Sequence, residues 1–226
     1  MKEIYSYKTN LMHTILILDF ETTGLNPYLN DIIEIAIKKM GYDDKFQTLV
    51  KPKRLPKGLI TYIPPHITNI TKITDTMIHN EAITKQKAIY NMLTFIDNIC
   101  DGDGLIYLVS HNGTIFDFII FRRMIQEYIH KSQFTRFKEN LIKRIRYIDS
   151  VLLAKLFISD KEKVNQPALC KKYNIINESE HRAMGDVQAL EKLYEHLCEE
   201  CSKKYNEEEG NYMLENPEKI IEKLFV

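Results

Sequence analysis

Residues 14–21, TILILDFE, constrain the fold more than any other part of the chain. Bulky apolar residues occupy both odd and even positions of this run, so an extended segment would be apolar on both faces. A strand of this kind is stable only when other elements cover it from both sides. The run therefore predicts the central, buried strand of a sheet.

The segments that follow predict the rest of the sheet and the helices around it. Residues 32–40 and 45–50 come at short spacing and predict antiparallel neighbours of the first strand. A long loop with several prolines occupies residues 51–65, and from Thr84 the apolar residues recur at helical spacing. Further strands are predicted at residues 105–110 and 146–149, and further helices at residues 116–129, 151–157, 165–173 and 182–201. This order predicts an α/β fold in which helices flank a mixed sheet.

The length of 226 residues suits one large domain with short extensions. We expect an N-terminal lead-in over residues 1–11, one domain over residues 12–203 and a C-terminal tail over residues 204–226. Ile220, Ile221, Leu224 and Phe225 recur at helical spacing in this tail. The tail is therefore predicted to contain a short helix that folds back on the domain.

The composition excludes several classes of protein. Lys plus Arg and Asp plus Glu both number 31, so the formal net charge is zero, which is untypical of a general polyanion binder. No apolar run approaches the roughly 20 residues of a membrane span. The first residues lack the apolar core of a secretory signal, and the four cysteines include one CxxC, Cys198–Cys201, but no second CxxC to pair with it. We therefore expect an intracellular protein, cytoplasmic or nuclear, that is neither secreted nor bound to a membrane.

Two carboxylates end the predicted central strand. Asp19 and Glu21 are two residues apart, so both side chains project from the same face. Like charges beside a buried apolar run are costly unless a cation or a proton neutralises them. Gly24, in the turn that follows, is free to adopt a positive φ and bring backbone N–H groups close to a ligand. Taken alone, the pair also fits a simple turn cap.

Two more clusters contain acidic residues near predicted helix starts. Asp117 closes the run HNGTIFD, where a strand passes into a helix whose dipole would stabilise a carboxylate. His181 is predicted in the loop before the last long helix and Asp186 in its early turns, so the two would approach one point from different directions. Alone, Asp117 fits a helix cap, and a single histidine fits the surface better than a site.

The clusters together resemble the DEDDh family of 3′→5′ exonucleases, which includes proofreading and three-prime repair exonucleases. LDFETTGLNP, SHNGTIFDF and EHRAMGDVQAL resemble the three motifs of that family. The resemblance implies a ribonuclease-H-like fold and hydrolysis of phosphodiester bonds at the 3′ end of DNA, single-stranded or frayed, with release of nucleoside 5′-monophosphates. The chain departs from the family at Asn69, where glycine is common, and at Pro167, which would interrupt a helix that packs behind the site.

The resemblance also implies the roles of the site residues. Two Mg²⁺ or Mn²⁺ ions would be held by carboxylate oxygens, the ligands that such hard cations prefer. Asp19 would bridge the ions, Glu21 and Asp186 would complete the first site, and Asp117 would hold the second. His181 is the candidate general base. The candidate substrate-binding residues are Thr22, Thr23, Gly24, Leu25, Asn112 and Phe116, of which Leu25 would wedge against the last base.

Other functions stay open at this point. An exoribonuclease that trims short RNA 3′ ends would carry the same motifs, as would a catalytically silent module that binds nucleic-acid ends. The intact set of carboxylates favours an enzyme, and DNA is favoured over RNA as its partner. The resemblance also allows a homodimer or a polymerase partner. The basic residues between 131 and 146 fit a solvated helical face and a phosphate-binding surface equally well.

Overall fold

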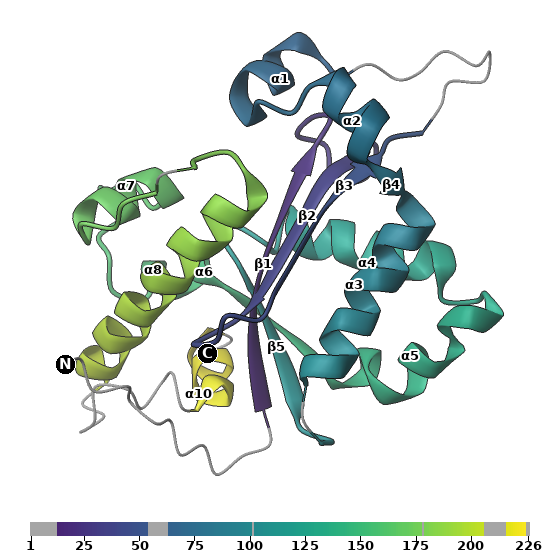
Figure 1. The fold of residues 1–226 in the computed structure, drawn as a ribbon. Coiled ribbons are helices and arrows are strands. Elements are labelled where there is room, and N and C mark those ends of the chain that lie inside the picture. The colour runs from purple at the N-terminus through teal and green to yellow at the C-terminus, as the bar shows by residue number, and fades with distance from the viewer. Residues whose placement is uncertain (1–12, 54–62, 101, 178, 206–215, 225–226) are drawn as a thin grey trace.

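The computed structural model describes residues 13–53, 63–100, 102–177, 179–205 and 216–224, so the predicted lead-in lies outside the described residues. The chain forms a six-stranded mixed sheet with the strand order β4-β3-β2-β1-β5-β6 (Figure 1). The strands are β1 (His13–Thr22), β2 (Ile32–Lys39), β3 (Lys45–Lys51), β4 (Ile83–Thr84), β5 (Leu105–Ser110) and β6 (Ile145–Asp149). The predicted α/β fold is confirmed.

Strand β1 is central, as its apolar pattern predicts. It pairs antiparallel with β2 and parallel with β5, while β2 and β3 pair antiparallel. Leu16, Leu18 and Phe20 of β1 belong to one buried cluster, and Ile17 belongs to another on the opposite face. Both faces of the strand are therefore covered, and its alternating side chains point to different layers.

The first layer covers the face that Leu16 and Leu18 share (Figure 1). It contains α3 (Lys85–Ile99), α4 (Asp117–Tyr128) and α5 (Thr135–Asn140), with the short 3-10 turns η1 (Ser132–Phe134) and η2 (Ile142–Arg144) around α5. Helix α3 begins where the sequence predicts, because the side chain of Thr84 accepts a hydrogen bond from the Lys87 amide.

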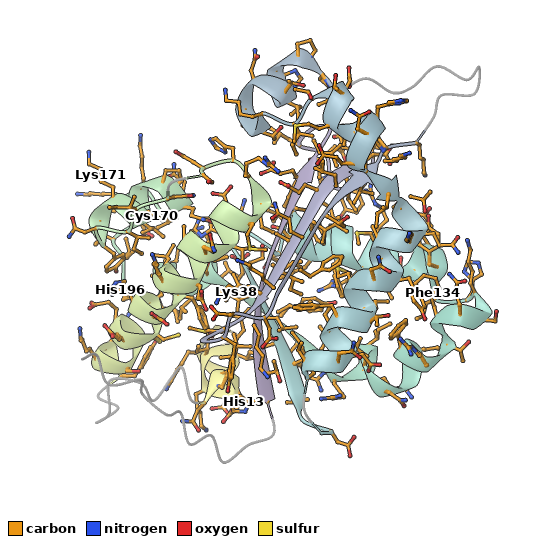
Figure 2. All side chains as sticks on the ribbon, viewed as in Figure 1. His13, Lys38, Phe134, Cys170, Lys171 and His196 are labelled. Carbon is orange, nitrogen blue, oxygen red and sulfur yellow. The ribbon has the colours of Figure 1, made fainter. Side chains whose placement is uncertain are left out.

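The second layer covers the opposite face. It contains α6 (Ser150–Lys155), α7 (Gln166–Lys172), α8 (Ala183–Lys204) and α10 (Pro217–Leu224). Helix α8 lies against β1 and β2, where Lys38 of β2 meets Glu191 of α8 at 2.5 Å (Figure 2 labels Lys38). Ile220 of α10 is fully buried in this layer, so the tail contains the helix that its spacing predicts. The domain boundaries remain a prediction, and Phe225 lies outside the described residues.

Several details differ from the sequence prediction. The apolar periodicity does not predict α1 (Pro65–Thr71) and α2 (Asp75–Glu81), two short helices that pack over Ile33 and Leu49 as a third cluster. Pro167 does not interrupt a helix: α7 begins at Gln166, where Asn165 caps it and a proline in the first turn is tolerated. Among the described residues, no helix is long and apolar enough to span a membrane.

Candidate active site

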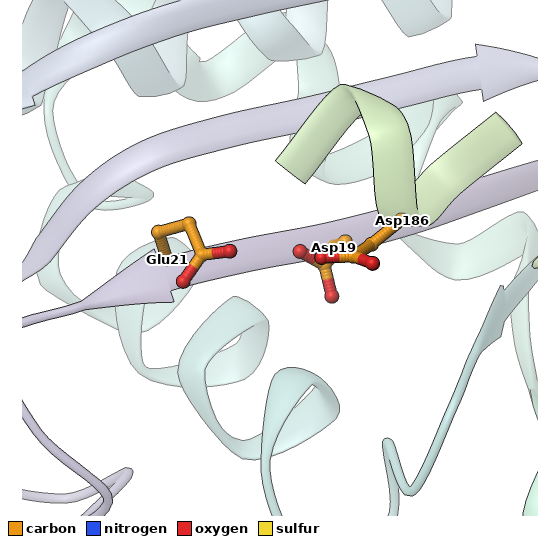
Figure 3. Close-up of side chains that lie close together, drawn as sticks. All are labelled: Asp19, Glu21 and Asp186. Carbon is orange, nitrogen blue, oxygen red and sulfur yellow. The ribbon is translucent and has the colours of Figure 1, made fainter. Parts of the chain in front are cut away.

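Three carboxylates meet where β1 ends beside the start of α8. Asp19 and Glu21 project from β1, and Asp186 reaches them from the first turn of α8 (Figure 3). One carboxylate oxygen from each residue lies within 4.8 Å of the other two. The structure therefore brings together three of the four predicted metal ligands, from segments more than 160 residues apart in the sequence.

Burial disfavours the charged form of all three carboxylates, and neighbouring acidic groups add to this effect at Asp19 and Glu21. Burial, then the charges of Asp186 and Glu34, raise the pKa of Glu21 to about 8. Burial, followed by the charges of Asp117 and Glu21, raises the pKa of Asp19 well above its usual range, and burial also raises that of Asp186. A bound divalent cation would reverse these shifts. Three half-buried oxygen donors of this kind fit Mg²⁺ or Mn²⁺ better than a softer metal.

Asp117 lies near these carboxylates but has its own hydrogen-bond partners. It is the first residue of α4 and is 3% exposed. Its carboxylate accepts from the Ser110 hydroxyl at 2.7 Å and from the Phe20 amide at 3.2 Å. Burial raises its pKa to about 7 although both hydrogen bonds oppose the shift. It is not part of the three-carboxylate group, and its role as a ligand of a second ion remains a prediction.

His181 is next to the site in the chain, and the described contacts of its imidazole are with Glu180 rather than with the three carboxylates. The ring is half-exposed and its Nε2 lies 3.7 Å from Glu180 Oε1. The backbone adopts a φ of 61°, and its N–H donates to Asp186 Oδ2 at 3.0 Å. The structure thus gives His181 a backbone role in holding Asp186, while its role as a general base remains a prediction.

The loop before α8 also fixes Asp186. Asn177 Nδ2 donates to Asp186 Oδ1 at 2.8 Å, so both carboxylate oxygens have a partner in this loop. A Cβ on Gly185 would lie 2.3 Å from the backbone carbonyl oxygen of Ser179. The loop can pass this close to α8 only because residue 185 is glycine.

Sequence reasoning missed the residue that anchors the start of α8. Glu34 of β2 is 1% exposed and accepts hydrogen bonds from the Arg182 guanidinium at 2.7 and 3.2 Å and from the Ala183 amide at 3.0 Å. It lies directly opposite Glu21 in the β1–β2 ladder. A single acidic residue within the apolar run IIEIAI was the available signal, because a buried charge requires a partner.

The turn after β1 differs in part from its prediction. Gly24 does not adopt a positive φ, but a Cβ there would lie 2.9 Å from the Asn30 side chain, which would have to shift. The amide of Thr23 already donates to the Asp31 carbonyl at 2.8 Å, so a substrate contact through it would have to replace this bond. The Thr22 hydroxyl donates to the Gly24 carbonyl at 2.6 Å. Leu25 is 88% exposed and free to contact a ligand.

The second motif is held in place by a residue that sequence reasoning also missed. Asp149, at the end of β6, accepts from the amides of Asn112 at 3.0 Å and Thr114 at 2.9 Å. Asn112 is exposed and adopts a φ of 63°. Phe116 is half-buried and packs against the first layer. Asn112 therefore remains a candidate for substrate contact, while Phe116 has a packing role.

Comparison with known proteins agrees with this geometry. Exonuclease DPD1 (chloroplastic/mitochondrial) of Arabidopsis thaliana is 30% identical over 193 residues, which cover 81% of this chain and 56% of that protein. The PolC-type DNA polymerase III of Thermotoga petrophila is 27% identical over 193 residues, 84% of this chain and 12% of the polymerase. The chain thus spans about half of the plant protein and about an eighth of the polymerase.

Solved structures share the fold. Escherichia coli exonuclease I, crystallised in complex with a dT13 oligonucleotide, superposes with a TM-score of 0.64 over 86% of this chain and 43% of that chain, at 15% identity. A family model described as exonuclease, RNase_T, matches residues 16–194, which include all the motifs above. The chain therefore belongs to this exonuclease family, and the resemblance that its motifs predict is confirmed.

Proposed function

We propose that this protein is a metal-dependent 3′→5′ exonuclease that removes nucleoside 5′-monophosphates from single-stranded or frayed DNA ends. The observation that carries the proposal is the meeting of Asp19, Glu21 and Asp186 within 4.8 Å. Burial, and for Asp19 and Glu21 also the neighbouring carboxylates, raises the pKa values of all three, and a bound cation would offset both effects. DNA is favoured because relatives include a DNA polymerase and a structural neighbour was solved with a DNA oligonucleotide.

The residues of the site would have two roles, metal binding by the carboxylates and proton transfer by His181. Asp19, Glu21 and Asp186 would hold the first of two Mg²⁺ or Mn²⁺ ions, and Asp117 would contribute to the second. When bound, such ions supply Lewis-acid activation of water and of the phosphodiester. His181 would take a proton from the attacking water after its imidazole turns from Glu180 towards the carboxylates, a side-chain rotation that its exposure permits.

The turn after β1 would hold the 3′-terminal nucleotide. Thr22 and Thr23 lie beside the metal ligands, and Leu25 presents an apolar side chain to solvent. Contact between Leu25 and the last base requires that base to leave its pair, which accounts for a preference for unpaired ends. A reducing, intracellular location fits the same proposal, because the four cysteines, all within the described part of the chain, are buried and form no disulfide.

The test is digestion of matched DNA and RNA oligomers with Mg²⁺, with Mn²⁺ and with EDTA. We expect rapid digestion of DNA with either metal and none in EDTA. A faster digestion of RNA would replace the proposal with an exoribonuclease. Binding of 3′ ends without hydrolysis under every condition would identify a silent end-binding module, and efficient cutting of a closed circular strand would identify an endonuclease.

A further inference from the structure

The turn after β1 displays three large, exposed apolar side chains. Leu25 is 88% exposed, and Tyr28 and Leu29 are 67% and 80% exposed. Elsewhere in the described residues, large apolar side chains are exposed singly: Tyr42, Ile70, Ile115 and Ile176. Single exposed apolar residues are ordinary, but a concentration within five residues beside a candidate active site indicates a binding surface.

Hydrogen bonds within the turn hold the backbone of Tyr28 and Leu29 in one conformation without a ligand. Asn26 Oδ1 accepts from the amide of Tyr28 at 2.9 Å and from that of Leu29 at 3.2 Å, and the Asn26 carbonyl accepts from the Asn30 amide at 2.9 Å. Pro27 follows Asn26 at the second position (i+1) of this turn, where its restricted φ is favourable. The two side chains are therefore presented on a single, ordered turn.

The turn is also tied to the strand that carries the carboxylates. The Thr23 hydroxyl accepts from the Asp31 amide at 3.0 Å, beside the Thr23–Asp31 backbone bond. Asn30 Oδ1 accepts from the Asn26 amide at 2.8 Å, and the Asn30 carbonyl accepts from Arg123 Nη2 of α4 at 2.6 Å. The surface that Tyr28 and Leu29 present therefore has a fixed position relative to β1.

The chemistry of this surface suits nucleobases. Every base has an apolar face that stacks on an aromatic ring, so stacking tolerates any sequence. A tyrosine on an ordered backbone loses little conformational freedom on binding, and a neighbouring aliphatic side chain extends the contact area. The exposed positions of Tyr28 and Leu29 bury little surface within the fold, so packing does not explain them.

We propose that Tyr28 and Leu29 form a stacking surface for the unpaired bases next to the 3′-terminal one. This inference rests on the proposed function, because it takes the bound polymer to be the exonuclease substrate. The surface would add affinity for single strands without selecting their sequence. Leu25 would meet the terminal base, and Tyr28 and Leu29 the bases that follow it into the site.

The chain contains no tryptophan, so one introduced at this surface gives an unambiguous fluorescence signal. Tyr28→Trp in the Asp19→Asn background should show saturable quenching when an oligothymidylate is added with Mg²⁺. The matched control is Tyr42→Trp in the same background. Tyr42 is also exposed, at 54%, but follows β2 at the end opposite the turn. We expect no quenching in the control.

Kinetics give the second measurement. Tyr28→Ala in the active protein should raise KM for single-stranded DNA about tenfold with kcat little changed, because stacking binds ground state and transition state alike. Tyr42→Ala should change neither constant. The stacking surface is wrong, and the proposed function stands, if the active protein digests DNA but neither readout changes. In that case the Tyr28→Trp fluorescence is not quenched by oligothymidylate, and Tyr28→Ala has the KM of the unmodified protein. If the unmodified protein digests no nucleic acid, the proposed function is wrong. The fluorescence quenching alone then shows whether Tyr28 and Leu29 bind the bases of a single strand.

Discussion

Arg182 and Glu34 form the contact that joins the start of α8 to the middle of the sheet. Arg182 Nη2 lies 2.7 Å from Glu34 Oε1, and Nε lies 3.2 Å from Oε2. The contact places α8 so that Asp186 reaches Asp19 and Glu21. It also brings a positive charge that partly opposes the rise in the pKa of Glu21. One contact thus serves both the position and the electrostatics of the carboxylates.

Glu34→Gln should therefore weaken both folding and turnover. The neutral side chain leaves the guanidinium and the Ala183 amide with a poorer acceptor, so we expect the free energy of unfolding to fall by about 1–3 kcal/mol in urea titrations. Displacement of Asp186 should lower kcat by about tenfold, the effect of about 1.4 kcal/mol on the barrier.

The control for this change is Glu162→Gln. Glu162 pairs with Lys172 at 2.7 Å, but both side chains are exposed. Exposed pairs contribute at most about 1 kcal/mol, so this variant should match the unmodified protein in stability and kcat. Equal behaviour of the two variants would contradict the anchoring role of Glu34.

Asp19→Asn should lower turnover by orders of magnitude. The metal-free variant should be at least as stable as the metal-free unmodified protein. The substitution removes a ligand but also removes a charge that Asp117, Glu21 and Asp186 repel. The measurement is the melting temperature in EDTA together with the rate in Mg²⁺. Undiminished activity would exclude Asp19 as a metal ligand.

His181→Ala should lower kcat by roughly 10²–10⁴-fold, the usual contribution of a general base. Affinity for an oligonucleotide should change little, and the acidic limb of the pH–rate profile should flatten. His196→Ala is the control, because His196 is also half-exposed but stacks on Tyr173. A variant at position 181 that keeps its rate and its acidic limb would show that another group activates the water.

Leu25→Ala should reduce discrimination between paired and unpaired ends. Opening a terminal pair costs roughly 1–2 kcal/mol of stacking, so the unmodified protein should cut a mismatched end about tenfold faster than a matched one. The variant should cut both more slowly and with a smaller ratio, while its requirement for Mg²⁺ stays the same. If Leu25→Ala leaves the ratio of the two cutting rates unchanged, Leu25 does not act as a wedge.

The metal-free protein should lose stability between about pH 6.5 and about pH 8.5. The folded pKa values of Asp117, about 7, and Glu21, about 8, exceed the unfolded values, so the folded state holds more protons in this range and its stability falls as pH rises. His111, whose folded pKa is lowered to about 4 by burial, acts in the opposite sense only below about pH 6.5. Melting temperatures in EDTA should therefore fall across the range, and Mg²⁺ should reduce the slope. A rise with pH would contradict the raised pKa values of these buried carboxylates.

The sequence predicts those features of the site that depend on local periodicity. Asp19 and Glu21 share a face because alternate strand residues do, and Asp186 falls in the first turn of a helix whose start is marked by polar residues. Glu34 and Arg182 are 148 residues apart and meet only through the packing of α8 on β2. No local pattern specifies that contact. The side-chain direction of His181 and the hydrogen bonds of Asp117 depend on the assembled fold in the same way, as do the short helices α1 and α2.

The carboxylates at the end of β1 and the start of α8 are proposed to support removal of nucleotides from a 3′ end. The most direct measurement follows linear single-stranded DNA with a label at either the 5′ or the 3′ end, in Mg²⁺ and in EDTA. We expect that a 3′ label is released at once as a mononucleotide, that a 5′-labelled strand shortens step by step, and that EDTA stops both. Release of a 5′ label as the first product, or digestion that continues in EDTA, would contradict this proposal.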